Sequence, residues 1–290
     1  MLKSAPRSQR VLQDEKVASL SFNMSRVTLQ WYELNKETGK DPCLRIPIAD
    51  IYGPVIDRAF PTLGHIGWRP GTHGASYTYI KRITPETNDQ LVDLLELLQQ
   101  ILALTITRHL EPHFHSELDE IYALDFNFKQ DVQPLTYTEV GTLEHRAKEN
   151  QDSEAIESLA VRLSEVIRRH PTFSRADVIV AVPPRPGSSF HLPVELVKRI
   201  GEILGRGTGL DLVKTNHAKL RGLSLEQKLK TLDGIFQLGG SITGKTVLII
   251  DDLYQSGVTA WSLAKFLKTN GAREVYALAC VKSWSDTDNL

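Results

Sequence analysis

The chain has 290 residues, of which 41% are hydrophobic and 24% charged, a composition typical of globular proteins that excludes a disordered or fibrous chain. Its 34 Lys and Arg residues nearly balance 35 Asp and Glu residues, so the net charge is -1 and no global basic field exists to hold nucleic acid. The two cysteines, Cys43 and Cys280, lie far apart in sequence, which excludes a disulfide framework and a four-cysteine zinc site. This cysteine usage favours a reducing, cytoplasmic location.

Residues 1–17 carry several charges and no apolar segment, so we expect no signal peptide. The most hydrophobic helical stretch, Leu91–Leu110, contains Asp93, Glu96 and Arg108, which predicts a buried helix and not a membrane span. We therefore expect a cytoplasmic protein with no membrane partner and no strong nucleic-acid signal.

Before about Leu135 the hydrophobic patterning is mixed. The predicted strands are Val27–Leu34 and Ser76–Ile83, and the predicted helices are Asp50–Phe60 and Glu86–Leu110. A loop is predicted at Gly67–Ser76. Residues 1–134 are therefore predicted to form an additional N-terminal α+β domain, to which the sequence assigns no function.

From about Leu135 onward, strands and helices alternate with clear periods. The predicted elements are a helix at Ser153–His170, a strand at Asp177–Val182, a helix around Leu196–Leu204, a weak strand at Leu210–Val213, a helix capped by Ser224, a strand at Thr246–Leu253, a helix ending near Gly271 and a strand at Glu274–Val281. This alternation predicts an α/β domain over residues 135–290, with a mainly parallel sheet flanked by helices.

The segment Gly239–Thr246, GGSITGKT, satisfies the sequence formula of an ATP-binding P-loop. A P-loop follows a strand and opens a helix, so that backbone N–H groups converge on phosphate. Here the segment precedes the predicted strand and no helix begins at Lys245. We therefore interpret it as a glycine-rich turn.

The most informative segment is Val247–Thr259, VLIIDDLYQSGVT. A buried strand ends in Asp251 and Asp252, and a turn of small residues then opens a helix. Ligands of open α/β sheets bind at the carboxyl ends of strands, and a helix N-terminus attracts phosphate. Adjacent carboxylates can accept hydrogen bonds from sugar hydroxyls, so the pattern predicts a ligand with a phosphate and a vicinal diol. The alternative is a capped helix with solvated aspartates at its edge.

These residues resemble the phosphoribosyl pyrophosphate (PRPP) motif of type I phosphoribosyltransferases. The resemblance implies that Asp251 and Asp252 hold the ribose hydroxyls, and that Mg²⁺ is held through the ligand without a direct protein ligand. It also implies a loop around the 5′-phosphate, made of Tyr254, Gln255, Ser256, Gly257, Val258 and Thr259. Gln255 departs from the pattern, because the family usually has Thr or Ser there.

The resemblance narrows to the ComF-like group. Val180–Pro184 is similar to the group's pyrophosphate-binding turn, which implies a pyrophosphate loop of Pro183, Pro184 and Arg185. Lys214–Phe236 is similar to its mobile loop, which implies catalytic roles for Lys219 and Arg221 beside the aspartate pair. The alternative for this basic tract is a solvated surface loop.

The cysteine zinc site usual in that group is absent from the first half of this chain. His109 and His113 would share a helix face, but Pro112 interrupts the helix between them. We therefore interpret His109, His113 and His115 as surface residues, with a metal site as the less favoured alternative.

Three functions remain open from the sequence. The first is a Mg²⁺-dependent phosphoribosyltransferase that transfers phosphoribosyl from PRPP to an unidentified acceptor and releases pyrophosphate. The second is a non-catalytic module that senses PRPP or a nucleotide. The third is a ComF-like interaction protein in DNA uptake, stress or defence. A protein partner bound through residues 1–134 and a homodimer are further expectations, and Lys219 and Arg221 favour catalysis.

Overall fold

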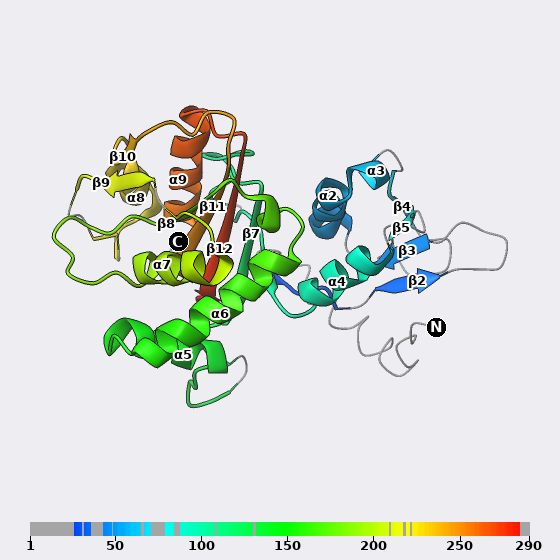
Figure 1. The fold of residues 1–290 in the computed structure, drawn as a ribbon, viewed down its shortest axis with the longest axis horizontal. Coiled ribbons are helices and arrows are strands. Elements are labelled where there is room, and N and C mark those ends of the chain that lie inside the picture. The colour runs from blue at the N-terminus through cyan, green and yellow to red at the C-terminus, as the bar shows by residue number, and fades with distance from the viewer. Residues whose placement is uncertain are drawn as a thin grey trace. The chain divides into compact units, whose positions relative to one another are not determined.

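The computed structural model describes residues 26–30, 32–35, 43–47, 49–64, 67–70, 79–83, 88–107, 109–129, 132–208, 210–216, 219–220 and 222–284. The chain divides into two compact units (Figure 1). The first comprises Met1–Thr105 with Arg169–Thr172, and the second comprises Ile106–Arg168 with Phe173–Leu290. The division therefore falls earlier than the boundary predicted at Leu135. The predicted segment 1–17 lies outside the described residues.

The first unit is of the α+β type, as the sequence predicts. Its elements are β1 (Arg26–Val27), β2 (Glu33–Asn35), β3 (Cys43–Ile46), α2 (Ala49–Ala59), α3 (Pro61–Gly64), β4 (Arg69–Pro70), β5 (Tyr79–Arg82), α4 (Asn88–Leu98) and β6 (Leu102–Leu104). Strands pair antiparallel in the order β2-β3-β5-β4, and β1 pairs antiparallel with β6.

Two predictions for this unit are wrong. The helix predicted at Glu86–Leu110 ends at Leu98, and β6 follows after a turn, because the fully buried Leu102–Leu104 pairs with β1. Tertiary pairing here overrides a helical hydrophobic pattern. The strand predicted at Val27–Leu34 is divided into β1 and β2, with no regular structure at residues 28–30.

The second unit has the alternating strands and helices that the sequence predicts. Its elements are β7 (Glu120–Phe126), α5 (Glu139–Glu149), α6 (Ser153–Arg169), the 3-10 turn η2 (Phe173–Arg175), β8 (Val178–Ala181), α7 (Leu192–Leu204), β9 (Asp211–Lys214), α8 (Leu225–Leu232), β10 (Phe236–Gly239), β11 (Thr246–Tyr254), α9 (Val258–Thr269) and β12 (Glu274–Lys282). The capping box at Ser224 forms as predicted, with Gln227 as its partner.

Its sheet runs in the order β7-β12-β11-β8, and every neighbouring pair is parallel. The α/β class with a mainly parallel sheet flanked by helices is thereby confirmed. Strand β11 is fully buried from Thr246 to Ile250, and β12 is buried from Val275 to Lys282. Burial of each such aliphatic side chain contributes about 1.5–3 kcal/mol, so these two apolar runs fix the centre of the sheet. Helix α7 packs on β8 and β11, α9 on β12, and α5 on β7 and β12.

Strands β7 and β9 depart from the predictions. β7 was not predicted as a core strand, yet it pairs in parallel with β12 over Glu120–Phe126. The weak strand predicted near Leu210 forms β9, but β9 pairs antiparallel with β10 in a separate two-stranded sheet. The basic segment after Lys214 therefore begins outside the parallel sheet.

Two further predictions concern membranes and the P-loop formula. Within the described ranges, every helix is too short or too polar to cross a lipid bilayer. The segment Gly239–Thr246 joins β10 to β11 as a turn, and no helix begins within it. The interpretation of that segment as a glycine-rich connection is confirmed.

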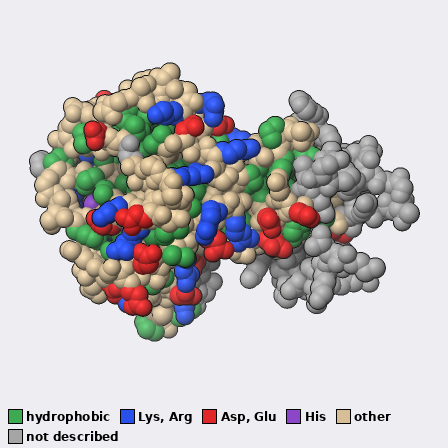
Figure 2. All heavy atoms as spheres, in the orientation of Figure 1, with side chains coloured by type: hydrophobic (Ala, Val, Ile, Leu, Met, Phe, Trp, Pro, Cys, Tyr) green, Lys and Arg blue, Asp and Glu red, His purple; other side chains and the backbone are tan. Residues whose placement is uncertain are grey.

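On the face drawn in Figure 2, Lys and Arg side chains are interspersed with Asp and Glu.

Candidate ligand site at the carboxyl end of the sheet

A cavity of about 650 Å³ lies where β8 and β11 end in the second unit. The parallel register explains its position. Ile250 pairs with Ala181 at the end of β8, so the residues that follow Ile250 continue beyond the neighbouring strand. Ligand sites of parallel sheets form at this edge, because strands end there and helices begin. The cavity is lined by charged groups of both signs, with cations in excess of the two aspartates.

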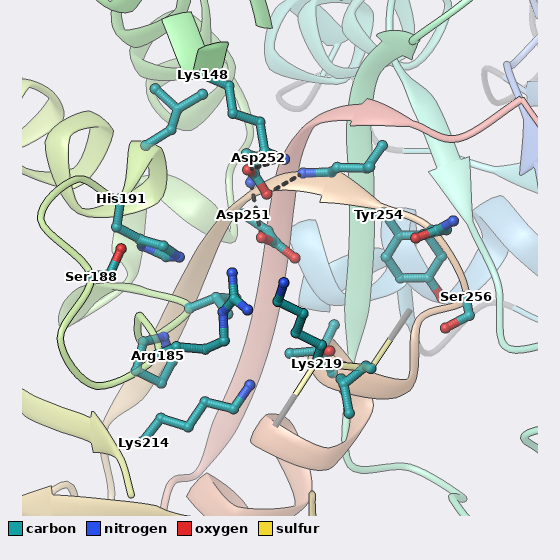
Figure 3. Close-up of a pocket in the computed structure, with 18 of the residues that line it drawn as sticks. Lys148, Arg185, Ser188, His191, Lys214, Lys219, Asp251, Asp252, Tyr254 and Ser256 are labelled. Atoms are coloured by element: carbon teal, nitrogen blue, oxygen red, sulfur yellow. Dashed lines mark hydrogen bonds and ion pairs between the residues drawn. The ribbon is translucent and has the colours of Figure 1, made fainter. Parts of the chain in front are cut away.

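Asp251 and Asp252 line this cavity from the end of β11 (Figure 3). Asp251 Oδ1 accepts a hydrogen bond of 2.9 Å from the Asp252 backbone N–H, and Asp252 Oδ1 accepts one of 2.8 Å from Leu253 N–H. Burial and the neighbouring Asp252 charge raise the pKa of Asp251 well above its ordinary value. The pair therefore concentrates its negative charge on Asp252.

Lys148 of α5 reaches the same carboxylate. Its Nζ lies 2.7 Å from Asp252 Oδ2 and 3.4 Å from Glu144 Oε1, one helical turn earlier on α5. Burial opposes ionisation of Asp252, but the Lys148 ammonium lowers the pKa of that carboxyl below its ordinary value. Burial also opposes the charge on Lys148, yet the Asp252 and Glu144 carboxylates raise the pKa of Lys148 overall.

The turn between β11 and α9 has the geometry of an anion cradle. Gly257 is the N-cap of α9 and has φ of 83°, in the left-handed region that glycine adopts without strain. Since glycine has no capping side chain, the N–H groups of the helix start and the helix dipole suit a phosphate. Tyr254, Gln255, Ser256, Gly257 and Thr259 all line the cavity.

A buried lysine donates hydrogen bonds to the backbone of this turn. Lys282, at the end of β12, has no solvent exposure, and its Nζ donates to the backbone oxygens of Gln255 at 2.9 Å and Ser283 at 3.0 Å. The same ammonium lies 5.7 Å from the centroid of the Tyr254 ring, within range of a cation–π interaction. Register supports the arrangement, because Tyr254 pairs with Lys282 across β11 and β12. The cradle is thus tied to the core of the sheet.

Three cations face the aspartates across the cavity. Figure 3 shows Arg185, Lys214 and Lys219 pointing into the same space near Asp251. Burial and the Arg185 charge lower the pKa of Lys214, which Asp251 only partly offsets. Like charges held close together favour binding of an anion that carries several charges. Lys228 of α8, itself 5% exposed, adds a further cation to the lining.

His191 borders the cavity at the start of α7 (Figure 3). Burial lowers its pKa below the ordinary value; Asp252 opposes this shift, and Lys148, Lys214 and Arg185 reinforce it. His191 is therefore neutral at pH 7. Its Nδ1 is buried and makes no hydrogen bond with the described residues.

The structure brings most of the predicted site residues together. Ten of them line the cavity: Pro183, Arg185, Lys219, Asp251, Asp252, Tyr254, Gln255, Ser256, Gly257 and Thr259. Two predicted residues do not line the cavity, although their neighbours in sequence do: Pro184 and Val258. Val258 is buried in α9. Arg221 and His217 lie outside the described residues.

Sequence reasoning did not single out Lys148, His191 or Lys228. Lys148 has the pattern of an ordinary i, i+4 surface pair with Glu144, and His191 looks like a loop residue before a helix. Only the packing of α5 against β12 and β7 brings Lys148 to the aspartates. The one available signal for Lys228 was its place in the amphipathic helix that follows the basic segment.

The donor set fits a magnesium ion held partly by the ligand. Mg²⁺ in phosphate sites is bound by one or two carboxylates together with substrate oxygens and water. Asp251 and Asp252 supply two carboxylates at the cavity wall. In the described part of the chain, no group of three or more His, Cys, Asp or Glu side chains is arranged to hold a metal ion alone. His109, His113 and His115 are exposed.

Comparisons with known sequences give a local match. No protein-family model matches the chain. Over 66 residues, 23% of this chain, the sequence is 33% identical to a ribose-phosphate pyrophosphokinase from Nostoc sp.. The match spans 20% of the length of that protein.

Solved structures of phosphoribosyltransferases and of a related synthetase are similar to part of the chain. A hypoxanthine phosphoribosyltransferase from Staphylococcus aureus matches at 20% identity and a TM-score of 0.30, covering 44% of this chain and 64% of that one. A purine phosphoribosyltransferase from Pyrococcus horikoshii matches at 18% identity and a TM-score of 0.31, covering 45% and 83%. The phosphoribosylpyrophosphate synthetase of Mycobacterium smegmatis matches at 18% identity and a TM-score of 0.30, covering 43% and 33%.

Proposed function

We propose that the chain is a Mg²⁺-dependent phosphoribosyltransferase that binds PRPP and transfers its phosphoribosyl group to an acceptor, with release of pyrophosphate. One observation carries the proposal. The aspartate pair, the cradle that begins at Tyr254 and the cations Arg185, Lys214 and Lys219 line a single cavity. PRPP carries a vicinal diol, a 5′-phosphate and a pyrophosphate, and each group has a chemically matched partner there.

The assignment of the groups follows from the local chemistry. Asp252 and Asp251 accept hydrogen bonds from ribose hydroxyls, and the start of α9 holds the 5′-phosphate with backbone N–H groups. The pyrophosphate then faces Arg185, Lys214 and Lys219 on the opposite side of the cavity (Figure 3). In this orientation the bond from the sugar to pyrophosphate lies between the carboxylates and the cations.

The chain's own residues would favour transfer by stabilising the departing pyrophosphate. Negative charge grows on that group as its bond to the sugar breaks, and preorganised cations stabilise this charge more strongly in the transition state than in the ground state. Bound Mg²⁺ would supply Lewis-acid chemistry to this step, and Asp251 and Asp252 are the carboxylates that would hold it together with the ligand. Arg185 is the best-suited side chain for bidentate contact with phosphate.

The local sequence match supports the ligand class. The matched protein is named a ribose-phosphate pyrophosphokinase, so its name denotes ribose phosphate and pyrophosphate. The narrower ComF-like assignment rests on the sequence resemblance at Val180–Pro184, at Lys214–Phe236 and at Thr136–His170, the segment before the first core strand. Three further points stay predictions: a protein partner bound through the N-terminal unit, a homodimer and a cytoplasmic location. The acceptor of the phosphoribosyl group is unidentified.

A sensor of PRPP is the second candidate. It is favoured by Gln255, whose exposed side chain stands where the family usually has a small hydroxyl, and by the loop Pro183–Ser189, whose one basic residue is Arg185. The first feature weakens the phosphate cradle and the second weakens the hold on pyrophosphate, without removing the diol and phosphate subsites.

Pyrophosphate release separates the two candidates. The protein is incubated with PRPP, Mg²⁺ and a panel of bases, amines and macromolecular acceptors, and pyrophosphate is measured against the Asp252→Asn variant. Release that depends on one acceptor and on Asp252 supports the transferase. Saturable PRPP binding without release by any acceptor supports the sensor, and absence of PRPP binding contradicts both.

A further inference from the structure

Lys148 enters the diol end of the cavity from an element that the PRPP motif does not include. It belongs to α5, while Asp251 and Asp252 end β11, and Figure 3 shows its side chain extended toward Asp252. The Lys148 side chain is 39% exposed and lines the cavity, while its partner carboxylate on Asp252 is 17% exposed. The ion pair therefore lies in the wall of the ligand site and not on the outer surface.

The hydrogen-bonding capacity of this ammonium is not exhausted. A lysine ammonium has three N–H donors. The described residues provide two acceptors, Asp252 Oδ2 at 2.7 Å and Glu144 Oε1 at 3.4 Å. One N–H therefore stays available to an oxygen atom in the cavity. Asp252 Oδ2, with two lone pairs, can likewise accept a second hydrogen bond.

Glu144 fixes where the ammonium points. Its side chain is 9% exposed, and it lies four residues before Lys148 on the same face of α5. A nearly buried carboxylate on one side and Asp252 on the other restrict the otherwise flexible lysine chain. The Nζ atom is thereby preorganised beside the carboxylate that is assigned to a sugar hydroxyl.

We propose that Lys148 is a specificity-determining residue that makes the subsite recognise a sugar hydroxyl jointly with Asp252. This inference rests on the proposed function. A hydroxyl can donate its proton to Asp252 Oδ2 and accept the third N–H of Lys148, whereas a deoxy sugar does neither. Replacing that hydroxyl by hydrogen leaves two charged groups without a ligand partner, so the site discriminates against deoxyribose phosphates.

The test measures hydroxyl preference and not affinity alone. Binding of ribose 5-phosphate, 2-deoxyribose 5-phosphate and 3-deoxyribose 5-phosphate is measured by calorimetry for the wild type and for Lys148→Met. We expect the wild type to bind at least one deoxy sugar about tenfold to a hundredfold more weakly than ribose 5-phosphate. In Lys148→Met this ratio falls toward one, because ribose 5-phosphate loses affinity and that deoxy sugar does not.

Three variants distinguish recognition from structural support. Lys148→Arg keeps the cation and restores part of the preference. The double variant Glu144→Gln with Lys148→Met removes both charges, which protects the fold while the preference stays lost. Lys198→Met, an exposed lysine of α7 outside the cavity, retains the wild-type preference.

The outcomes separate this inference from the proposed function. If the wild type binds ribose 5-phosphate with a hydroxyl preference that Lys148→Met and the double variant both retain, Lys148 is only a structural ion pair. If the wild type binds all three sugars with equal affinity, the subsite does not recognise the hydroxyl and the inference is wrong. The phosphate subsite of the proposed function is not contradicted by that result. If the wild type binds none of them, the proposed function is overturned together with the inference.

Discussion

The phenol group of Tyr254 occupies the space that a side chain at Gly257 would need. A Cβ atom built at Gly257 would overlap the Tyr254 hydroxyl and approach its ring carbon Cζ to 2.7 Å. Gly257 also has φ of 83°, which L side chains rarely adopt. Both constraints fall on the residue that opens the proposed phosphate cradle, so the shape of the cradle depends on this close approach.

Gly257→Ala should therefore distort the cradle. The left-handed backbone alone costs an alanine about 1–2 kcal/mol, and the overlap with Tyr254 adds to that cost. We expect lower stability in urea unfolding and at least a tenfold loss of ribose 5-phosphate affinity.

Gly205→Ala is the matched control for this prediction. Gly205 ends α7 with φ of 62°, and a Cβ there meets no atom within 4 Å. It should show the backbone cost without loss of ligand affinity. Equal affinity of Gly257→Ala and the wild type for ribose 5-phosphate would contradict the assignment of the cradle.

Lys214 should reduce the stability of the ligand-free protein. Burial and the Arg185 charge lower its pKa from the ordinary value of 10.5, so the folded chain binds this proton less tightly than the unfolded chain. Stability from this group therefore rises as the pH increases toward 10.5 and falls at lower pH. Lys214→Met should leave the melting temperature unchanged or raise it by about 2 °C.

The same variant should lose stabilisation by pyrophosphate. The wild type is expected to melt several degrees higher with pyrophosphate and Mg²⁺ than without, and Lys214→Met should show little of this shift. Lys198→Met should keep the shift, because that lysine lies outside the cavity. A full pyrophosphate shift in Lys214→Met would show that the leaving group does not bind there.

Lys282 should support the cradle from inside the protein. Lys282→Met removes the donor to the backbone oxygens of Gln255 and Ser283, and loss of hydrogen bonds to a charged group costs about 1.5–3 kcal/mol each. We expect a lower free energy of unfolding in urea and weaker binding of inorganic phosphate. Unaltered phosphate affinity in this variant would mean that the turn holds its shape without the lysine.

Lys219 should act on turnover and not on sugar binding. Its side chain faces the proposed pyrophosphate position, away from the cradle (Figure 3). Lys219→Ala is expected to lower the rate of pyrophosphate release about a hundredfold and to leave ribose 5-phosphate affinity unchanged. The sequence makes the same prediction for Arg221→Ala. Lys230→Ala, an exposed lysine outside the cavity, serves as the control, and an equal rate for Lys219→Ala and the control would leave the segment as a solvated loop.

The sequence predicts most of the second unit correctly, because its helices have apolar residues at helical spacing and its central strands have short apolar runs. Val247–Ile250 and Val275–Val281 are continuous apolar runs, which are typical of strands buried on both faces. The aspartate pair and the glycine turn were predicted because they are contiguous with one of these strands. The sequence does not predict β7, because Glu120 and Asp125 interrupt the apolar pattern of EIYALDF. Its pairing with β12 also depends on a partner distant in sequence.

Other features depend on tertiary packing. The run at Leu102–Leu104 fits a helix and a strand equally well, and pairing with β1 decides between them. Lys148 has no local signal at all, because nothing in α5 indicates that the helix packs beside the end of β11. A charged pair at i, i+4 is ordinary on a helix surface, so only the fold shows that Asp252 completes it.

Calorimetry of PRPP and Mg²⁺ binding, with the wild type and with the double variant Asp251→Asn and Asp252→Asn, tests the central claim most directly. The wild type should bind with saturation, and the double variant should lose at least a hundredfold in affinity, because each amide keeps one acceptor oxygen and presents N–H donors where the carboxylate has its second acceptor. Inorganic phosphate should still raise the melting temperature of both proteins, which shows that the cradle is intact. Equal affinity of the two proteins for PRPP would contradict the assignment of the site.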